Sequence, residues 1–292
     1  MTQQQTVAFL GLGGMGQPMA ATALRAGLPT VVWNRTPRAT ESLADLGARV
    51  AGSAAEAAGQ AAIAVTMVTD VNAVTAIAVD QGMLAALPPG AIWAQMSTIG
   101  VAGIERLAAL VERERPDVVF LDAPVAGSRG PAAAGRLTIY ASGPTGARDR
   151  VAPLFDALGQ RTVWVGPAGQ GSRLKLVNNI LLAFLAEGIA ESVALAHAVG
   201  IGTETVLTAL AGNPIVPPWA EAKLPRMARG DYSPEFPLSL ALKDLYLTLD
   251  AVDPAEFTVA GCLAAQWRRA VDRGFGGDDV TVIARAMTPG PG

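Results

Sequence analysis

The stretch "FLGLGGMGQPMA" (residues 9–20) decides the fold, because it places Gly11, Gly13 and Gly16 between an apolar run and a helix-like segment. Gly11 permits a tight turn, Gly13 lets a pyrophosphate approach the backbone, and Gly16 lets the helix lie close to the strand. A helix that begins here directs free N–H groups and partial positive charge at phosphates. The motif therefore predicts a dinucleotide site rather than an ordinary glycine-rich turn. The residues expected to hold the cofactor are Gly11, Leu12, Gly13, Gly14, Met15 and Gly16.

The end of the second expected strand, "VVWNRT" (31–36), bears on the choice of dinucleotide. NAD-binding proteins carry a carboxylate there for the ribose hydroxyls, whereas this chain has Asn34. A carboxylate would repel a 2′-phosphate and an amide does not. Arg35 and Thr36 add a cationic fork and a hydroxyl donor, and Arg38 adds further charge. The sequence predicts NADP, with NAD the less expected cofactor.

Short apolar runs alternate with helix-like segments through the first half of the chain. Runs of this kind suit strands that are buried on both faces of a parallel sheet, and the alternation indicates repeated βαβ units. Two later runs, 137–142 and 162–166, are expected to close a first domain over residues 1–166. The two later runs flank an expected helix at 146–158; the other expected strands are 6–10, 30–34, 61–68, 91–96 and 118–122, with helices between them at 14–26, 39–47, 71–87 and 101–115.

After Gly171 no further strand is expected. One long helical pattern covers about 172–199, ends at Gly200 and is apolar nearly all round, which predicts a buried helix. Because a small domain cannot bury such a helix alone, a homodimer is expected. The predicted fold class is α/β: an N-terminal Rossmann-type doubly wound sheet, a long interdomain helix and an all-α C-terminal domain over 167–292. Further helices are expected near 203–211, 237–251, 258–273 and 278–287, with a loop at Pro214, Pro217 and Pro218.

Composition excludes several classes of partner. The 292 residues are 51% hydrophobic and carry a net charge of −3, which argues against nucleic acid or an anionic membrane as partner. A single cysteine, Cys262, cannot form an intrachain disulfide. The N-terminus lacks the pattern of a signal peptide, and the apolar stretch 180–186 is too short to span a bilayer. A cytoplasmic protein with no membrane partner is expected.

A polar cluster opens the long helix. In "GQGSRLKLVNN" (169–179), Lys175 and Asn179 are four residues apart and share a helix face, with Asn178 beside them. The lone histidine, His197, lies far along the same helix, so a histidine-based dehydrogenase mechanism and histidine- or thiolate-ligated metal sites are not expected. Lys175 could instead extend to solvent while the asparagines tune the helix end, but amides inside an apolar helix need partners. The cluster favours a catalytic site.

Five motifs in order resemble the β-hydroxyacid dehydrogenase family, which includes 3-hydroxyisobutyrate dehydrogenase, tartronate semialdehyde reductase and the glyoxylate/succinic semialdehyde reductases. The third and fifth motifs lean towards the last branch. The motifs are "FLGLGGMGQPMA", "VWNRT", "FLDAPVAGSRGPAAAGRLTI" (120–139), "GQGSRLKLVNN" and "FPLSLALKDLYLTL" (236–249).

This resemblance implies a role for each matching residue. Lys175 would be the general acid in reduction and the base in oxidation, and Asn179 would hold the substrate with Asn178 nearby. Lys243 would reach the nicotinamide and the substrate, oriented by Asp244. By the same resemblance, Thr98 would lie near the nicotinamide ribose, and Val68 and Thr69 would lie on the adenosine side of the cofactor. Gly127 would offer a backbone N–H to a substrate carboxylate.

One position departs from the family pattern. The family usually reads DAPVSGG or DAPVSGS, and this chain has Ala126 where that serine stands. The lost hydroxyl would weaken carboxylate binding by roughly 1.5–3 kcal/mol. Ser128 could replace it, the substrate could lack a small-acid carboxylate, or the change could be harmless. Substrate choice would depend on apolar residues such as Trp219, Phe236 or Leu240.

The predicted function is hydride transfer between NADPH and the carbonyl of a small aldehyde or keto acid. Two alternatives remain at this point. Imine reductases act on C=N bonds on a similar scaffold, but they usually replace the catalytic lysine that this chain keeps at Lys175. A non-catalytic NADP-binding module is the other, and the retention of Lys175, Asn179 and Lys243 together argues against it.

Overall fold

The computed structural model describes residues 5–287, so the outermost ends of the two predicted domains, 1–4 and 288–292, lie outside it. Its contacts divide the chain into two compact units, Met1–Lys175 and Leu176–Gly292. The division falls inside the long helix α9 (Gln170–Ala198), because the first turn of that helix is tied to strands of the first unit. The expected boundary at residue 166 lies just before this helix.

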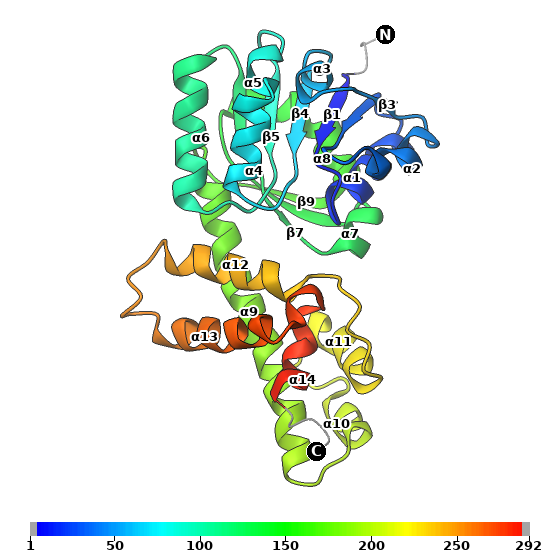
Figure 1. Cartoon of the computed structure of the whole chain (residues 1–292), viewed down its shortest axis with the longest axis vertical. Coiled ribbons are helices and arrows are strands. Elements are labelled where there is room, and N and C mark those ends of the chain that lie inside the picture. The colour runs from blue at the N-terminus through cyan, green and yellow to red at the C-terminus, as the bar shows by residue number, and fades with distance from the viewer. Residues whose placement is uncertain (1–4, 288–292) are drawn as a thin grey trace. The chain divides into compact units, whose positions relative to one another are not determined.

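The first unit is built on a six-stranded sheet in the order β3-β2-β1-β4-β5-β6, with every neighbouring pair parallel (Figure 1). This is the strand order of a Rossmann fold, and the predicted fold class is confirmed. The five expected strands are present, and β3 was missed because it is only two exposed residues long. The strands are β1 (Val7–Leu10), β2 (Thr30–Trp33), β3 (Arg49–Val50), β4 (Ile63–Thr66), β5 (Ile92–Gln95) and β6 (Val119–Asp122).

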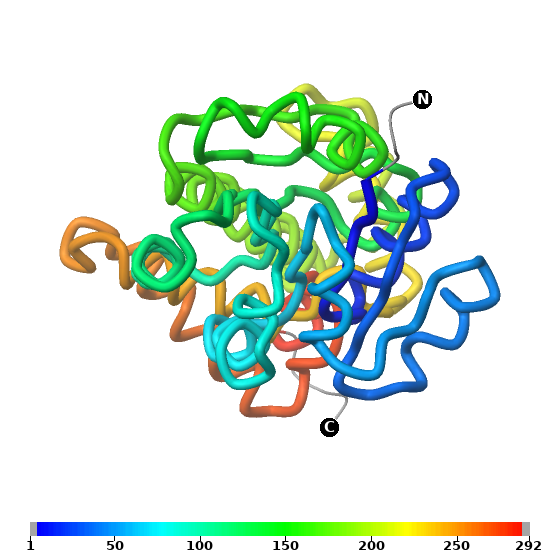
Figure 2. Tube along the Cα trace, turned by 90° about the horizontal axis from the view of Figure 1, so that it is seen from above, coloured from blue at the N-terminus to red at the C-terminus, as the bar shows by residue number. Residues whose placement is uncertain are grey.

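Alternate residues of each strand face opposite layers of helices. Val7 and Phe9 join a core with α1 (Gly16–Arg25) and α8 (Arg148–Leu158). Ala8 and Leu10 join a second core formed with α3 (Ala54–Ala58), α4 (Val71–Thr75), α5 (Met83–Ala86) and α6 (Val101–Glu114). Both faces are therefore covered, which is why the strands are apolar throughout. Seen from above, the dark-blue first strands lie at one side of this unit and the green α6 at the other (Figure 2).

Two later runs of the first unit are strands, as expected, and the expected helix 71–87 needs correction. The runs near 137–142 and 162–166 form a separate small sheet with β7 (Val125–Ala126), in which β7 is antiparallel to β8 (Leu137–Ala141) and β8 is parallel to β9 (Gly159–Trp164). The expected helix 71–87 is interrupted by a π-helical turn, η2 (Ala76–Asp80), and by Gly82, whose φ of +70° is not helical. The remaining short elements are η1 (Pro37–Thr40), α2 (Glu41–Ala44), α7 (Arg129–Ala133) and η3 (Thr145–Ala147).

The second unit consists of helices and loops, with no β-strand within residues 176–287. The buried face of α9 packs on the other helices around Trp267, which is fully buried. Helix α11 (Pro218–Ala228) was not predicted, and it begins at Pro218, which was assigned to the loop; a proline is compatible with the first position of a helix. The other elements are α10 (Thr203–Leu210), α12 (Leu238–Leu249), α13 (Thr258–Asp272), η4 (Phe275–Gly277), η5 (Val280–Val282) and α14 (Ile283–Met287).

The burial predicted for α9 is wrong for the single chain. Ala183, Ala186 and Ala190 lie in the core of the second unit, whereas Val177, Leu181 and other apolar residues on the opposite side are exposed. Within residues 5–287, α9 is also the helix that is long and apolar enough to cross a membrane, with a mean hydropathy of 1.6. Core helices of globular domains can be equally long and apolar, and α9 packs one of its faces into the core of the second unit.

Candidate active site

The glycine loop between β1 and α1 has the contacts that explain two of its glycines. Gly11 has a φ of +98°, and a Cβ there would collide with Val68 and with the carbonyl of Met67 at the end of β4. A Cβ at Gly16 would collide with the carbonyl oxygen of Gly11. A side chain at Gly11 would therefore push the loop away from the end of β4, and a side chain at Gly16 would push the first turn of α1 away from the loop.

The other two glycines of the loop face open space. A Cβ at Gly13 or Gly14 would meet no described atom within 4 Å, and both residues are exposed. They lie at the carboxyl end of β1, beside β4, where the strand order of the sheet reverses and dinucleotides bind in such folds. The loop thus has room for a pyrophosphate where the N-terminus of α1 directs its N–H groups. These features fit the pyrophosphate of a dinucleotide.

Asn34, at the end of β2, is turned towards the glycine loop. Its Oδ1 accepts a hydrogen bond from the backbone N–H of Leu12 at 2.9 Å, and its Nδ2 donates to the carbonyl of Thr36 at 3.0 Å. The Asn34 side chain therefore connects the glycine loop to the segment that follows β2. Arg35 and Arg38 are exposed, and neither guanidinium has a hydrogen bond or ion pair with another residue of the range 5–287. The two cations are available for an anionic ligand beside the glycine loop.

A buried polar network at the ends of β4 and β5 was missed by the sequence reasoning. Ser97 accepts a hydrogen bond from the N–H of Val68 at 2.8 Å, and its own N–H donates to Oε1 of Gln95 at 2.8 Å. Trp93 donates to the hydroxyl of Thr66 at 2.9 Å. The sequence contained a signal for this network, because polar residues, Thr66 and Gln95, end the apolar runs of β4 and β5. The network fixes the two loops that carry the predicted residues Thr69 and Thr98.

The segment after β7 carries the predicted substrate residues of the first unit. Gly127 has a φ of +129°, and a Cβ there would lie 2.8 Å from Leu137 and 3.1 Å from Pro131, so only glycine fits. Ser128 precedes α7, and its hydroxyl makes no hydrogen bond to any residue within 5–287. Ala126 pairs with Thr138 in the small sheet. This pairing involves the backbone and does not depend on the type of side chain.

The first turn of α9 is held by Asp122, a fully buried residue at the end of β6. Its Oδ2 accepts hydrogen bonds from the N–H groups of Ser172, at 2.8 Å, and Gly169, at 3.1 Å, while its Oδ1 accepts from the Ser172 hydroxyl at 2.7 Å. The hydroxyl of Ser142 accepts from the N–H of Gly171 at 2.9 Å. A carboxylate distant in sequence therefore caps this helix.

Burial raises the pKa of Asp122 above its usual range, and the hydrogen bonds from Ser172, Ser142 and Gly169 oppose that effect. The helix also approaches the strands closely, because a Cβ at Gly171 would overlap the carbonyl of Tyr140. Lys175 is buried and follows Ser172 by three residues, which places the two on neighbouring turns of one helix face. The capped first turn thus sets the position of Lys175 within the first unit.

The second unit brings four predicted residues together. Asn178 donates to Oδ1 of Asn179 at 3.0 Å, and Nδ2 of Asn179 donates to Oδ2 of Asp244 at 2.6 Å. The other oxygen of Asp244 lies 2.7 Å from the ammonium of Lys243. Asn179 and Asp244 are both buried. The start of α9 and the middle of α12 are joined by this chain, which fixes the orientation of an amide and an ammonium.

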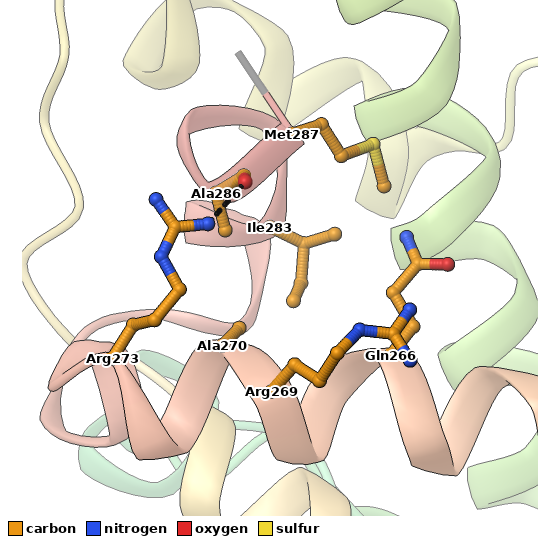
Figure 3. A pocket seen from close by; sticks show the side chains of 7 residues that line it. All are labelled: Gln266, Arg269, Ala270, Arg273, Ile283, Ala286 and Met287. Atoms are coloured by element: carbon orange, nitrogen blue, oxygen red, sulfur yellow. Dashed lines mark hydrogen bonds between the residues drawn. The ribbon is translucent and has the colours of Figure 1, made fainter. Parts of the chain in front are cut away.

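A hollow of about 190 Å³ lies between α13 and α14 and contains none of the predicted residues (Figure 3). Arg269 and Arg273 approach it from α13, and Ile283 and Met287 form its apolar wall. Arg273 donates to the carbonyl of Ala286 at 2.7 Å, so its guanidinium joins the two helices. Among residues 5–287 no cluster of His, Cys, Asp and Glu suited to a metal ion occurs.

Comparisons with known proteins match both units. Residues 6–166 match the family described as the NAD binding domain of 6-phosphogluconate dehydrogenase. Residues 169–287 match the one described as NAD-binding of NADP-dependent 3-hydroxyisobutyrate dehydrogenase. Glyoxylate/succinic semialdehyde reductase 1 of Arabidopsis thaliana is 30% identical, over 96% of this chain and 98% of that protein.

Two further relatives cover almost the whole chain. The NAD-dependent L-serine dehydrogenase of Pseudomonas aeruginosa is 34% identical, over 98% of this chain and 99% of that protein. The crystal structure of a 3-hydroxyisobutyrate dehydrogenase from Salmonella typhimurium is 28% identical and similar with a TM-score of 0.87, over 97% of this chain and 100% of that one. The similarity therefore extends through both units.

Proposed function

The chain belongs to the β-hydroxyacid dehydrogenase family and is an NAD(P)-dependent oxidoreductase, and we propose that it uses NADPH to reduce the carbonyl of a small aldehyde or keto acid, with Lys175 as proton donor. The observation that carries the proposal is the helix α9. Its first turn is capped by Asp122, Lys175 follows on the next turn, and Asn179 begins the hydrogen-bonded chain to Asp244 and Lys243.

The bound cofactor supplies the hydride. Negative charge then develops on the substrate oxygen, and the Lys175 ammonium stabilises this charge and donates the proton. An ammonium is the usual form of lysine near neutral pH, which suits reduction. In the reverse direction, the same nitrogen accepts the proton of the alcohol.

Asn179 and Lys243 orient the substrate in this proposal. The Asn179 amide is locked by Asp244 and Asn178, so its remaining donor and acceptor capacity has a fixed direction. Asp244 likewise holds the Lys243 ammonium, which adds positive charge for an anionic substrate. Fixed groups of this kind lower the barrier because they need not reorganise during the reaction.

The proposed preference for NADP rests on the residues after β2. Asn34 carries no charge and Arg35 and Arg38 are exposed cations, an arrangement that suits a 2′-phosphate. Arg35→Ala is expected to raise KM for NADPH about tenfold, which corresponds to about 1.4 kcal/mol, and to leave KM for NADH nearly unchanged. Arg106→Ala, which removes an exposed cation of α6, is the matched control. Equal effects on both cofactors would contradict the preference.

The proposed substrate class is a small carbonyl compound that bears a carboxylate. The exposed backbone of Gly127 and the unbonded hydroxyl of Ser128 support this, since both can donate to a carboxylate despite Ala126. The names of the relatives fit the class: one is a glyoxylate/succinic semialdehyde reductase and one an L-serine dehydrogenase.

The central experiment replaces Lys175 by Met. Turnover with NADPH and glyoxylate, succinic semialdehyde, methylglyoxal or a cyclic imine is measured, together with oxidation of L-serine by NADP⁺. We expect turnover with at least one carboxylated substrate, a fall of at least 10³-fold in Lys175→Met, and unchanged NADPH binding by calorimetry. Arg173→Met on the same helix is the control, because its partner Glu105 is exposed. Retained turnover would refute the role of Lys175. Activity with the imine alone, or tight NADPH binding with no turnover, would favour the alternative functions.

A further inference from the structure

The C-terminal end of helix α1 is joined to α7 by two side chains. The hydroxyl of Thr22 donates to the carbonyl oxygen of Ala132 in α7 at 3.0 Å, and the carbonyl oxygen of Ala133 lies 3.2 Å away. The guanidinium of Arg25 donates to the carbonyl of Ala133 and to the Thr22 hydroxyl, both at 2.6 Å. Thr22 and Ala132 are 110 positions apart in the chain, so only the folded first unit brings them together.

Thr22 is a buried residue inside α1, where threonine is less favourable than alanine or leucine. A threonine hydroxyl in a helix commonly bonds to a carbonyl of the preceding turn, whereas this one reaches another element. The carbonyls that it reaches belong to the last turn of α7, where a helix has no acceptor partners of its own. Helix α7 has five residues, too few for a stable helix without such contacts. Thr22 and Arg25 therefore cap α7 from outside.

Ala132 links this cap to the two residues proposed to bind the substrate carboxylate. Its carbonyl accepts a hydrogen bond from Thr22, and its own N–H donates to the carbonyl of Ser128 at 3.0 Å. Gly127 also lies against α7, because a Cβ built on it would be 3.1 Å from Pro131. The position of α7 therefore sets the positions of the Gly127 N–H and the Ser128 hydroxyl.

We propose that Thr22 and Arg25 are positioning residues for the carboxylate of the substrate. They act through α7, and they hold the donors at Gly127 and Ser128 in place relative to α1, whose other end begins at the glycine loop. The inference rests on the proposed function, because it takes these donors as the carboxylate site. Donors that are already held in place need no ordering when the substrate binds, so a loosened α7 weakens binding of the carboxylate.

The first test is Thr22→Val, which keeps the shape of the side chain and removes the hydroxyl. KM for glyoxylate or succinic semialdehyde should rise about fivefold, as expected for the loss of one hydrogen bond. The kcat and the Kd of NADPH should stay close to their wild-type values. KM for methylglyoxal, which carries no carboxylate, should not change. Thr22→Ser keeps the hydroxyl and should restore the wild-type KM for the carboxylated substrates.

Thr30→Val is the matched control, because Thr30 is also buried and its hydroxyl also donates to a backbone carbonyl, that of Leu28, at 2.8 Å. It lies at the start of β2 and makes this bond outside α7. A purely structural role for Thr22 would change KM for all substrates alike. The proposal is therefore overturned if Thr22→Val raises KM for methylglyoxal as much as for glyoxylate, or raises KM for glyoxylate no more than Thr30→Val does.

Arg25→Met tests the same cap through an exposed side chain, so it decides the question even if Thr22→Val does not fold. It removes the hydrogen bonds to Ala133 and to Thr22, and it should also raise KM for the carboxylated substrates without changing KM for methylglyoxal. Arg106→Met, at an exposed arginine of α6, is its control, and circular dichroism checks that each variant is folded. Equal KM values in Arg25→Met and Arg106→Met would contradict the proposal.

Binding of malonate separates this inference from the proposed function. Malonate carries carboxylates but no carbonyl to reduce, so its Kd for the NADPH complex, measured by calorimetry, does not depend on turnover. Thr22→Val should weaken malonate binding about fivefold, and Thr22→Ser and Thr30→Val should not. A wild type that reduces none of the carbonyl substrates contradicts the proposed function. Malonate binding that is absent, or equal in wild type and Thr22→Val, overturns this inference.

Discussion

Two of the buried aspartates, Asp122 in the first unit and Asp279 in the second, are stabilised by different chemistry. Asp122 in the first unit accepts hydrogen bonds from N–H groups and hydroxyls: those of Gly169 and Ser172 at the start of α9, and the hydroxyl of Ser142. Asp279 in the second unit binds the Lys223 ammonium at 2.9 Å, and both side chains are buried. Burial raises the pKa of each carboxyl, but at Asp279 the bonds and charge of Lys223 prevail and lower it.

The difference shows what each carboxylate holds. Asp279 also accepts hydrogen bonds from the backbone of Glu235 and Phe236, so the ion pair with Lys223 fixes the loop that precedes α12. Asp122 instead holds a helix end, where partial positive charge takes the place of a cation. Removal of a partner is therefore expected to lower the free energy of unfolding more at Asp279 than at Asp122, because the Asp279 carboxylate loses its cation.

The largest effect is expected for Lys223→Met. The substitution leaves the Asp279 carboxylate buried without its cation, and breaking a buried pair in this way costs about 3–5 kcal/mol. Thermal and urea unfolding of the second unit measure the loss. The control is Arg268→Met, which removes an exposed pair with Asp272 and should cost no more than about 0.5 kcal/mol. Equal losses in the two variants would show that the buried pair is not stronger than a surface one.

A smaller loss of stability, with a loss of activity, is expected for Asp122→Asn. The asparagine keeps one accepting oxygen but turns an NH₂ group towards buried donors, which costs about 2 kcal/mol. Because Lys175 lies one turn beyond the capped residues, kcat should fall while KM for the cofactor stays constant. Asp45→Asn, at an exposed aspartate of the same unit, is the control. A loss of stability with unchanged kcat would mean that the cap does not position Lys175.

The sequence predicted the parts of the molecule that depend on local pattern. The parallel strands, the glycine loop and α9 follow from apolar runs and from glycine spacing. The Asp122 cap was not predicted, because its partner Ser172 lies fifty residues away and only the fold brings the two together. Lys223 and Asp279 were missed for the same reason. The hydrogen bond between Asn179 and Asp244 was not predicted, since spacing alone gives no contact between α9 and α12, and the family resemblance implied only that Asp244 orients Lys243.

Glu187 of α9 is a further carboxylate whose hydrogen-bonding partners differ from those of Asp122 and Asp279. It accepts hydrogen bonds from Trp267, at 2.7 Å, and from Gln266, and no cation is paired with it within the part of the chain that the structure describes. Burial raises its pKa to about 7, and the nearby charge of Glu191 adds to the rise. Its protonated form is thus the one that the fold favours.

The smallest effect is therefore expected for Glu187→Gln, and it depends on pH. A raised pKa contributes stability that is fully present below pH 4.5, the ordinary value, and is lost as the pH rises through about 7. The glutamine variant does not lose this stability, so it should be more stable than wild type at pH 8. The expected difference is about 1 kcal/mol, because Glu187 is partly exposed and solvent screens its charge. Calorimetric melting at pH 5 and pH 8 measures the difference, with Glu256→Gln as the exposed control. If wild type and Glu187→Gln lost the same stability between the two pH values, burial would not raise the pKa of Glu187, and its carboxylate would be ionised at both pH values.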